Sequence, residues 1–243
     1  MKKTILLPLL CSVFFVFTAK AQDTPPEKPS SYLSITAGLS TPFGDFKKAD
    51  YSNNKAGFAK KGVMYDFEGG FYLHKNWGLG VMLTYQDQGR LNTDDATALS
   101  DGYRLEDGAY TSTVTASKRY SSFALMAGPQ YNIAFGKFIV DARVMVGALK
   151  SFSSPKVVVI LENYENIQTS TFTQNSSKSF AWAYGGSASF TYKLSDGVGL
   201  VLRENLIDAP TGFKISTDAH SGRTVDHQPM SVYQTSLGLR FAL

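Results

Sequence analysis

A chain of 243 residues fits a single domain, because all-β barrels and sandwiches often exceed about 200 residues as one unit. Hydrophobic residues make up 43% of it, which excludes a disordered chain, and aromatic residues make up 13%, which favours strands. The formal net charge is +4, but Lys2, Lys3 and Lys20 contribute three of the 24 basic residues. The other 21 face 20 acidic residues, so the charge predicts no nucleic-acid partner.

The first 21 residues have the pattern of an export signal. Two lysines precede the apolar run Ile5–Phe17, and Ala19-Lys20-Ala21 forms a small-x-small cleavage site. The run is too short for a transmembrane helix, which needs about 20 apolar residues. We therefore expect residues 1–21 to be a cleaved signal peptide, residues 22–30 to be a flexible, proline-rich lead, and residues 31–243 to form one domain.

That domain alternates apolar and polar residues with a period of two, which is the pattern of strands with two different faces. The alternation predicts eight strands, each long enough to cross a bilayer at a tilt. In chain order they are Tyr32–Phe43, Gly62–His74, Trp77–Asp87, Arg119–Phe135, Lys137–Phe152, Ser179–Leu194, Val198–Asp208 and Ser231–Leu243. Glu204 falls on the apolar face of the seventh segment and makes its register the least secure.

The connections between these segments alternate in length. Short ones lie near residues 75–76, 136 and 195–197, where Asn, Asp and Gly suit tight turns. Long ones cover roughly residues 44–61, 88–118, 153–178 and 209–230. This asymmetry is typical of a transmembrane β-barrel with short periplasmic turns and long extracellular loops.

Aromatic residues cluster at two heights of the predicted strands, as in the girdles at the two membrane interfaces. One set lies near the short turns: Tyr72, Trp77, Tyr131, Phe135, Phe138, Tyr192 and Phe241. The other lies near the long loops: Phe43, Phe67, Tyr85, Phe123, Phe152, Phe180 and Tyr233. The alternative is the aromatic core of a soluble periplasmic β protein. The sequence therefore predicts an all-β fold, an eight-stranded antiparallel transmembrane β-barrel.

The chain resembles the small OmpA/OmpX-type barrels, and more narrowly the PorT-like outer membrane protein beta-barrel domain family of Bacteroidetes. The resemblance rests on the Ala21-Gln22 junction, the opening strand from Leu33 to Gly38 and the closing strand from Leu237 to Phe241. It implies location in the cell outer membrane, contact with outer-membrane lipid and recognition by the barrel-assembly machinery. Members of the family mostly lack an assigned activity. The resemblance implies that this machinery reads a closing strand that ends with an aromatic residue, and the signal is imperfect here because the last residue is Leu243 and the aromatic is Phe241.

Six charged residues fall on the strand faces opposite the lipid-facing sets. They are Asp66, Glu68, Asp141, Arg143, Arg203 and Arg240. Eight strands leave an interior that side chains can fill, and an isolated buried charge is costly, so we expect these residues to pair. Their function is left open between a salt-bridge plug and a narrow ion path.

Few residues of the chain point to catalysis or metal binding. His220-Ser221 with Asp218 and Asp226 in the last loop could hold a base and a nucleophile, but neighbours in one loop rarely form a catalytic pair. His220 and His227 match no zinc spacing, the acidic run within 88–118 lacks the spacing of a calcium loop, and the only cysteine, Cys11, lies in the signal. We expect no enzyme, cofactor or metal site.

Two segments of the long loops carry strand patterns of their own. Residues 109–118 are rich in threonine and alternate, and residues 156–172 suggest a β-hairpin that extends the fifth and sixth strands outward. A protruding sheet edge offers unpaired backbone groups to another strand. We therefore expect a non-enzymatic protein whose extracellular loops contact a protein or a surface. The alternatives are a small porin-like channel and, more weakly, an enzyme at the outer rim.

Overall fold

The computed structural model of the chain describes residues 30–74, 76–163, 168–176, 178–214, 216–217 and 227–243. The signal peptide and most of the lead predicted from the sequence lie outside these residues, as do His220 and Ser221. Among the described residues no helix is both long and apolar enough to cross a membrane.

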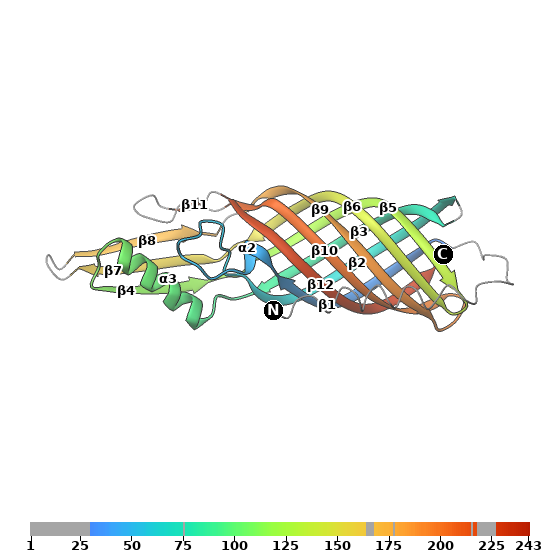
Figure 1. The fold of residues 1–243 in the computed structure, drawn as a ribbon, viewed down its shortest axis with the longest axis horizontal. Helices are drawn as coiled ribbons and strands as arrows, with labels where there is room; N and C mark the ends of the chain where they lie inside the picture. The colour runs from blue at the N-terminus through green and yellow to red at the C-terminus, as the bar shows by residue number, and fades with distance from the viewer. Residues whose placement is uncertain (1–29, 75, 164–167, 177, 215, 218–226) are drawn as a thin grey trace, which may run out of the picture.

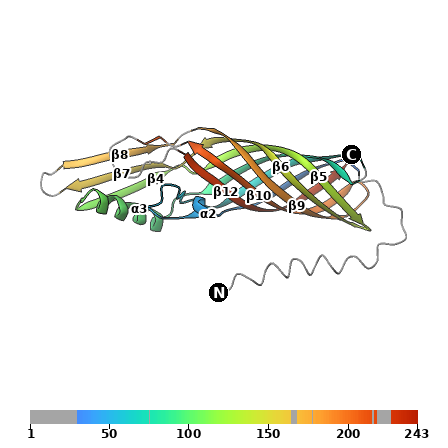
Figure 2. The same cartoon turned by 45° about the horizontal axis from the view of Figure 1, so that its top comes forward.

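Eight strands close into a barrel in which every neighbouring pair is antiparallel (Figures 1 and 2). Around the ring they follow the order β1, β12, β10, β9, β6, β5, β3 and β2. Their bounds are β1 Tyr32–Pro42, β2 Lys60–His74, β3 Trp77–Gly89, β5 Ser121–Phe135, β6 Phe138–Ser153, β9 Phe180–Lys193, β10 Val198–Lys214 and β12 His227–Ala242. The predicted eight-stranded barrel is confirmed, including the short connections at one end.

The last two barrel strands are longer than predicted. Their pairing passes through an irregularity between Ala209 and Phe213 and continues to the pair Lys214–His227. A proline and a glycine at positions 210 and 212 hide this extension in the sequence, since both residues interrupt a strand pattern. His227 thus begins β12 instead of lying in a loop.

Side chains alternate between the lumen and the outer wall along every barrel strand. On the outer wall, Trp182 is 74% exposed and Val144 is 67% exposed, whereas Arg203 in the lumen is fully buried. Glu204 keeps to this alternation without a bulge: it lies on the outer wall, where the Thr235 hydroxyl donates a hydrogen bond to it at 2.8 Å. An apolar outer face suits contact with lipid. Closure of the ring leaves no edge strand with unpaired backbone groups, which a lipid environment also requires.

The long connections form a second body at the opposite end from the short turns. Strands β4 (Thr111–Ser117), β7 (Lys156–Asn163), β8 (Gln168–Asn175) and β11 (Ser216–Thr217) form a sheet of order β11, β8, β7, β4. This sheet, with helix α3 (Thr93–Glu106), extends beyond the barrel in Figure 1. The predicted hairpin is present as β7 and β8, but it belongs to this separate sheet.

Helix α3 differs from the prediction, which places residues 93–106 within a long loop. The Asn92 side chain caps the helix by accepting a hydrogen bond from the Asp95 backbone N–H at 2.9 Å. Acidic residues in a first helical turn also oppose the partial positive charge of the helix N-terminus. Asp95 itself is buried and pairs with Lys60 Nζ at 2.6 Å.

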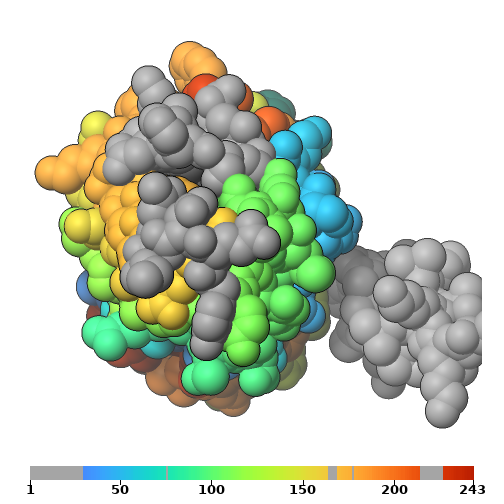
Figure 3. Space-filling view, turned by 90° about the vertical axis from the view of Figure 1, so that its left-hand side faces the viewer, coloured from blue at the N-terminus to red at the C-terminus, as the bar shows by residue number. Residues whose placement is uncertain are grey.

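One face of the second sheet packs on α3. Val157, Val159 and Leu161 of β7 are buried against Leu99 and Tyr103 of the helix. Seen from this end of the molecule (Figure 3), α3 and β4 in green lie beside the yellow and orange strands. The region predicted as loops is therefore a small folded unit with its own apolar core.

Three aromatic rings close the lumen beneath this unit. Phe46 lies in the four-residue helix α2 (Gly44–Lys47), and its ring centre is 5.0 Å from that of Tyr120 and 6.0 Å from that of Phe213. The Tyr120 hydroxyl donates to the Gly57 carbonyl at 3.0 Å. We call Phe46, Tyr120 and Phe213 the aromatic lid. Below it the lumen is filled by an apolar layer that includes Met82, Met126, Met145, Met230 and Ile207.

Replacing the central ring of the lid should destabilise the barrel. Phe46 is 1% exposed, and Phe46→Ala removes a large buried ring, so we expect a loss of about 3–5 kcal/mol in the free energy of unfolding. Denaturant unfolding of the protein in lipid vesicles would measure it. Leu105→Ala on α3, where the side chain is 72% exposed, should change stability by less than about 0.5 kcal/mol. Equal unfolding midpoints for the two variants would contradict a role of the lid.

Candidate functional site

The six charged residues singled out in the sequence all lie in the lumen. Each of them is at most 6% exposed, and they come from β2, β6, β10 and β12. We call them the charged layer: Asp66, Glu68, Asp141, Arg143, Arg203 and Arg240. The layer lies between the apolar layer and the end of the barrel that carries the short turns.

Glu68 is the centre of one part of the charged layer. Its Oε2 lies 3.2 Å from Arg143 Nη2 and also forms an ion pair with Arg203 Nη1. Arg203 further donates to the Ser34 hydroxyl at 3.1 Å, and Arg143 donates to the Tyr32 hydroxyl at 2.6 Å. One carboxylate on β2 therefore holds two guanidinium groups that enter from strands on other sides of the ring.

Asp141 is the centre of the other part and gathers five donors. It forms an ion pair with Arg240 and accepts a hydrogen bond from the Tyr72 hydroxyl. It also accepts from three polar side chains: Asn132 Nδ2 at 2.9 Å, Ser189 Oγ at 3.2 Å and Gln130 Nε2 at 3.3 Å. These donors come from β2, β5, β9 and β12, so one carboxylate on β6 connects five strands across the lumen.

Asp66 departs from the expectation that every charge pairs. Among the described residues no cation lies within ion-pair distance of it, and it accepts hydrogen bonds from Asn205 Nδ2 at 3.0 Å and from the Thr36 hydroxyl at 3.5 Å. Arg203, on the strand that also carries Asn205, instead pairs with Glu68. Because both arginines near this height converge on Glu68, Asp66 is held by neutral donors.

Several polar atoms of the charged layer have no hydrogen-bond partner among the described protein atoms. They include Asp66 Oδ1, Arg143 Nη1, and Arg203 Nε and Nη2. In polar interiors such groups are usually bonded to internal water. The layer therefore has the composition of a hydrated ion-pair plug on the periplasmic side of the apolar layer.

Sequence reasoning missed the neutral polar residues that complete the layer. Tyr32, Tyr72, Gln130 and Asn132 are buried at inward positions near the short turns, where they bond to the charged groups. Tyr72 was assigned to the girdle at the membrane interface, and the structure corrects this, because residue 72 has the inward parity of Asp66 and Glu68. Strand parity alone would have placed it correctly.

The described residues contain no cluster of three or more His, Cys, Asp or Glu side chains that could hold a metal ion. His227 is exposed at the start of β12, and His74 is exposed at the end of β2. His220 and Ser221, which the sequence analysis considered for catalysis, lie outside the described residues, as do Asp218 and Asp226. The geometry of the lumen thus supports charge pairing and hydration.

Removing the shared carboxylate should cost far more than removing one whose cation partner is exposed. Glu68→Gln leaves Arg143 and Arg203 without their counter-ion in a buried layer, and we expect a loss of about 3–5 kcal/mol in the free energy of unfolding. The matched control is Asp87→Asn, which removes the pair with Arg119 at 3.2 Å, where the arginine is 42% exposed. It should cost less than about 1 kcal/mol. Denaturant unfolding in vesicles compares them, and similar losses would contradict the central role of Glu68.

Comparison with solved structures shows likeness to small outer-membrane barrels at low sequence identity. Neisserial surface protein A is 10% identical with a TM-score of 0.49, covering 88% of this chain and 97% of that chain. The attachment invasion locus protein Ail of Yersinia pestis is 12% identical with a TM-score of 0.45, covering 88% and 100%. The N-terminal β-barrel domain of OprF from Pseudomonas aeruginosa is 10% identical with a TM-score of 0.37, covering 89% and 100%. Identities this low concern the fold alone.

No curated protein matches the sequence. The family model described as outer membrane protein beta-barrel domain matches residues 9–241, which is nearly the whole chain. With the closed ring, the apolar outer wall and the short turns at one end, this match places the protein in the outer membrane. The chain belongs to the outer membrane protein beta-barrel domain family.

Proposed function

We propose that the protein is a non-enzymatic outer-membrane anchor that presents an extracellular β-sheet to a protein partner. The observation that carries this proposal is the contrast between the two bodies: the barrel lumen is filled, while the sheet outside it ends in an open edge strand. Within the family, the narrower PorT-like assignment and recognition by the barrel-assembly machinery remain predictions.

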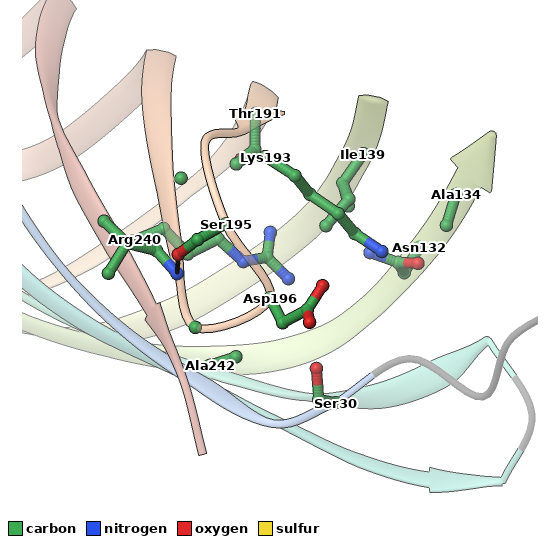
Figure 4. Close-up of a pocket in the computed structure, with 13 residues that line it drawn as sticks. Ser30, Asn132, Ala134, Ile139, Thr191, Lys193, Ser195, Asp196, Arg240 and Ala242 are labelled. Atoms are coloured by element: carbon green, nitrogen blue, oxygen red, sulfur yellow. Dashed lines mark hydrogen bonds between the residues drawn. The ribbon is translucent and has the colours of Figure 1, made fainter. Parts of the chain in front are cut away.

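Buried side chains fill the lumen at several heights. The aromatic lid lies at the extracellular end, the apolar layer lies below it, and the charged layer follows with Arg203 fully buried. The cavity at the periplasmic mouth, shown in Figure 4, has a volume of about 110 Å³ and is lined by residues near the short turns. These layers support a closed anchor over the porin-like alternative.

Strand β4 is the terminal strand of the extracellular sheet and pairs with β7 on one side. Of the described residues, no strand pairs with its other side. The Ser100 hydroxyl of α3 donates to the Ser112 carbonyl at 2.6 Å and so covers the beginning of the strand. Thr113, Thr115 and the two residues after Thr115 are exposed. An exposed edge of this kind can accept an added strand.

The sheet face that points away from α3 would give such a partner side-chain contacts. Cross-strand register places Thr113 beside Ile160 and Thr171, and Thr115 beside Val158 and Thr173. Ile160 and Val158 are partly exposed between the threonines. A partner strand added to β4 would place its own side chains next to Thr113 and Thr115, at the ends of these cross-strand rows. The partner that fits is therefore a protein segment with alternating β-branched residues.

The closed lumen predicts that the folded protein inserts into planar bilayers without conducting. We expect no current steps from a preparation whose folding is verified by the shift in electrophoretic migration on heating. Current steps that change on Arg143→Ala or Glu68→Ala would contradict the closed anchor and establish the ion path instead.

If a partner strand adds to β4, residues of β4 should lie next to that partner on the cell surface. A photo-crosslinking amino acid at Thr115 should give one discrete adduct on intact cells, and Thr113→Lys should abolish it, because a charged side chain on an edge disfavours strand addition. The matched control is the same crosslinker at Thr97, an exposed position on α3. Equal adducts at both positions, or none at Thr115, would contradict the model.

A further inference from the structure

The extracellular sheet has two faces, and helix α3 packs on only one of them. We call the other the open face. On β7 it carries Lys156, Val158, Ile160 and Glu162, and hydroxyl or amide side chains of β4 and β8 flank each of these four residues. None of the four is buried. Because the sheet extends past the end of the barrel (Figures 1 and 2), the barrel wall does not cover this face.

The middle of the open face is a small β-branched surface. Val158 and Ile160 are partly exposed there, and threonines of β4 and β8 lie on both sides of each of them. Rows of Val, Ile and Thr on a pleated sheet form a surface on which a second sheet can pack at a distance of about 10 Å. The open face therefore has the shape and composition of a sheet-packing surface.

The two ends of the open face carry opposite charges. Lys156 lies at the end of β7 nearer the barrel, beside Ser117, and Glu162 lies at the far end, where the Thr111 hydroxyl donates a hydrogen bond to it at 2.9 Å. Among the described residues, no anion lies within ion-pair distance of Lys156 and no cation lies within ion-pair distance of Glu162. Both charges are thus available to a molecule that packs on this face.

The row Lys156, Val158, Ile160 and Glu162 is complementary to itself when its direction is reversed. If the open face of a second copy stacks on it with antiparallel strands, Lys156 faces the second copy's Glu162, and Val158 faces the second copy's Ile160. With parallel strands, each charge would face its own kind, which disfavours that arrangement. The charge pattern therefore selects antiparallel stacking of two identical faces.

We propose that the open face pairs with the open face of a second copy that is anchored in a facing membrane. The strands of the extracellular sheet run lengthwise away from the barrel in Figure 1, so antiparallel stacking points the two barrels in opposite directions. Two copies in one membrane have parallel barrels and cannot adopt this arrangement. The inference rests on the proposed function only in placing the sheet outside the cell, and it requires no strand addition at β4.

The size of the open face implies that one such pair is weak. Three strands of seven or eight residues cover about 14 Å by 25 Å, which is roughly 350 Å² on each copy. Stable protein complexes bury about 800 Å² on each partner. Many copies on two facing membranes can still hold them together, because multivalent contacts add without any new contact surface. The pairing is therefore to be measured between membranes and not between single molecules.

The test is the clustering of lipid vesicles that carry the full chain with its sheet outward, followed by light scattering. Vesicles with the unchanged protein should cluster. Glu162→Lys and Lys156→Glu should each slow clustering at least tenfold, because two attractive contacts become repulsive. When vesicles with one variant are mixed with vesicles with the other, the facing charges are again opposite. Clustering of the mixture should return to within about twofold of the original rate.

The matched control is Asp101→Lys, which makes the same change of charge on α3, where the aspartate side chain is 59% exposed. It should cluster normally, and the shift in electrophoretic migration on heating verifies that each variant folds. The proposal is overturned if vesicles with the unchanged protein stay dispersed, if the mixture does not recover, or if Asp101→Lys acts like Glu162→Lys. Because these vesicles contain no other protein, dispersed vesicles overturn only the pairing of copies, whereas crosslinking of a different protein at Thr115 tests the anchor independently.

Discussion

Closure of the ring is the constraint on which the rest of the structure depends. Hydrocarbon offers no hydrogen bonds, so a spanning sheet must pair its first strand with its last. Here β1 pairs with β12 over its whole length, from the pair Tyr32–Ala242 to the pair Pro42–Val232. Gly38 and Gly238 lie on this seam, where an added Cβ would collide with the backbone of the opposite strand. The seam therefore depends on the absence of side chains at two inward positions.

A closed ring of eight strands also decides what the interior can contain. Its lumen is narrow enough for side chains to fill, so charged groups that point inward must find partners across it. Asp141 and Glu68 meet this need with donors from several strands, whereas methionines fill the irregular space above them. The methionines and the aromatic lid lie on the extracellular side of the charged layer, where they pack among buried polar side chains such as Gln86 and Gln234, which hydrogen-bond to each other at 2.8 Å.

Alternation with a period of two was sufficient to predict the barrel strands and the inward direction of all six charged residues. It could not predict their partners, because pairing across a lumen depends on the stagger of strands that are distant in sequence. Asp66 illustrates this, since its neighbours are Asn205 and Thr36 and no arginine. Phe46 and α3 were missed for another reason. A four-residue helix has no periodicity, and α3 has only three buried residues, one of them the ion-paired Asp95.

The stability of the barrel and the chemistry of its periplasmic mouth share residues, which limits how the two can be separated. Asp141 orients Asn132 and Arg240 at this mouth while it connects five strands, so its loss would damage both the fold and the lining of the mouth. Thr191 differs, because its hydroxyl has no partner among the described atoms and contributes no described contact to the ring. Thr191→Val would remove this buried hydroxyl and keep the backbone pairs of residue 191 with Ile139 and Val201. Side chains that line the mouth, such as Thr191, can therefore be altered without removing the contacts that Asp141 makes across the lumen.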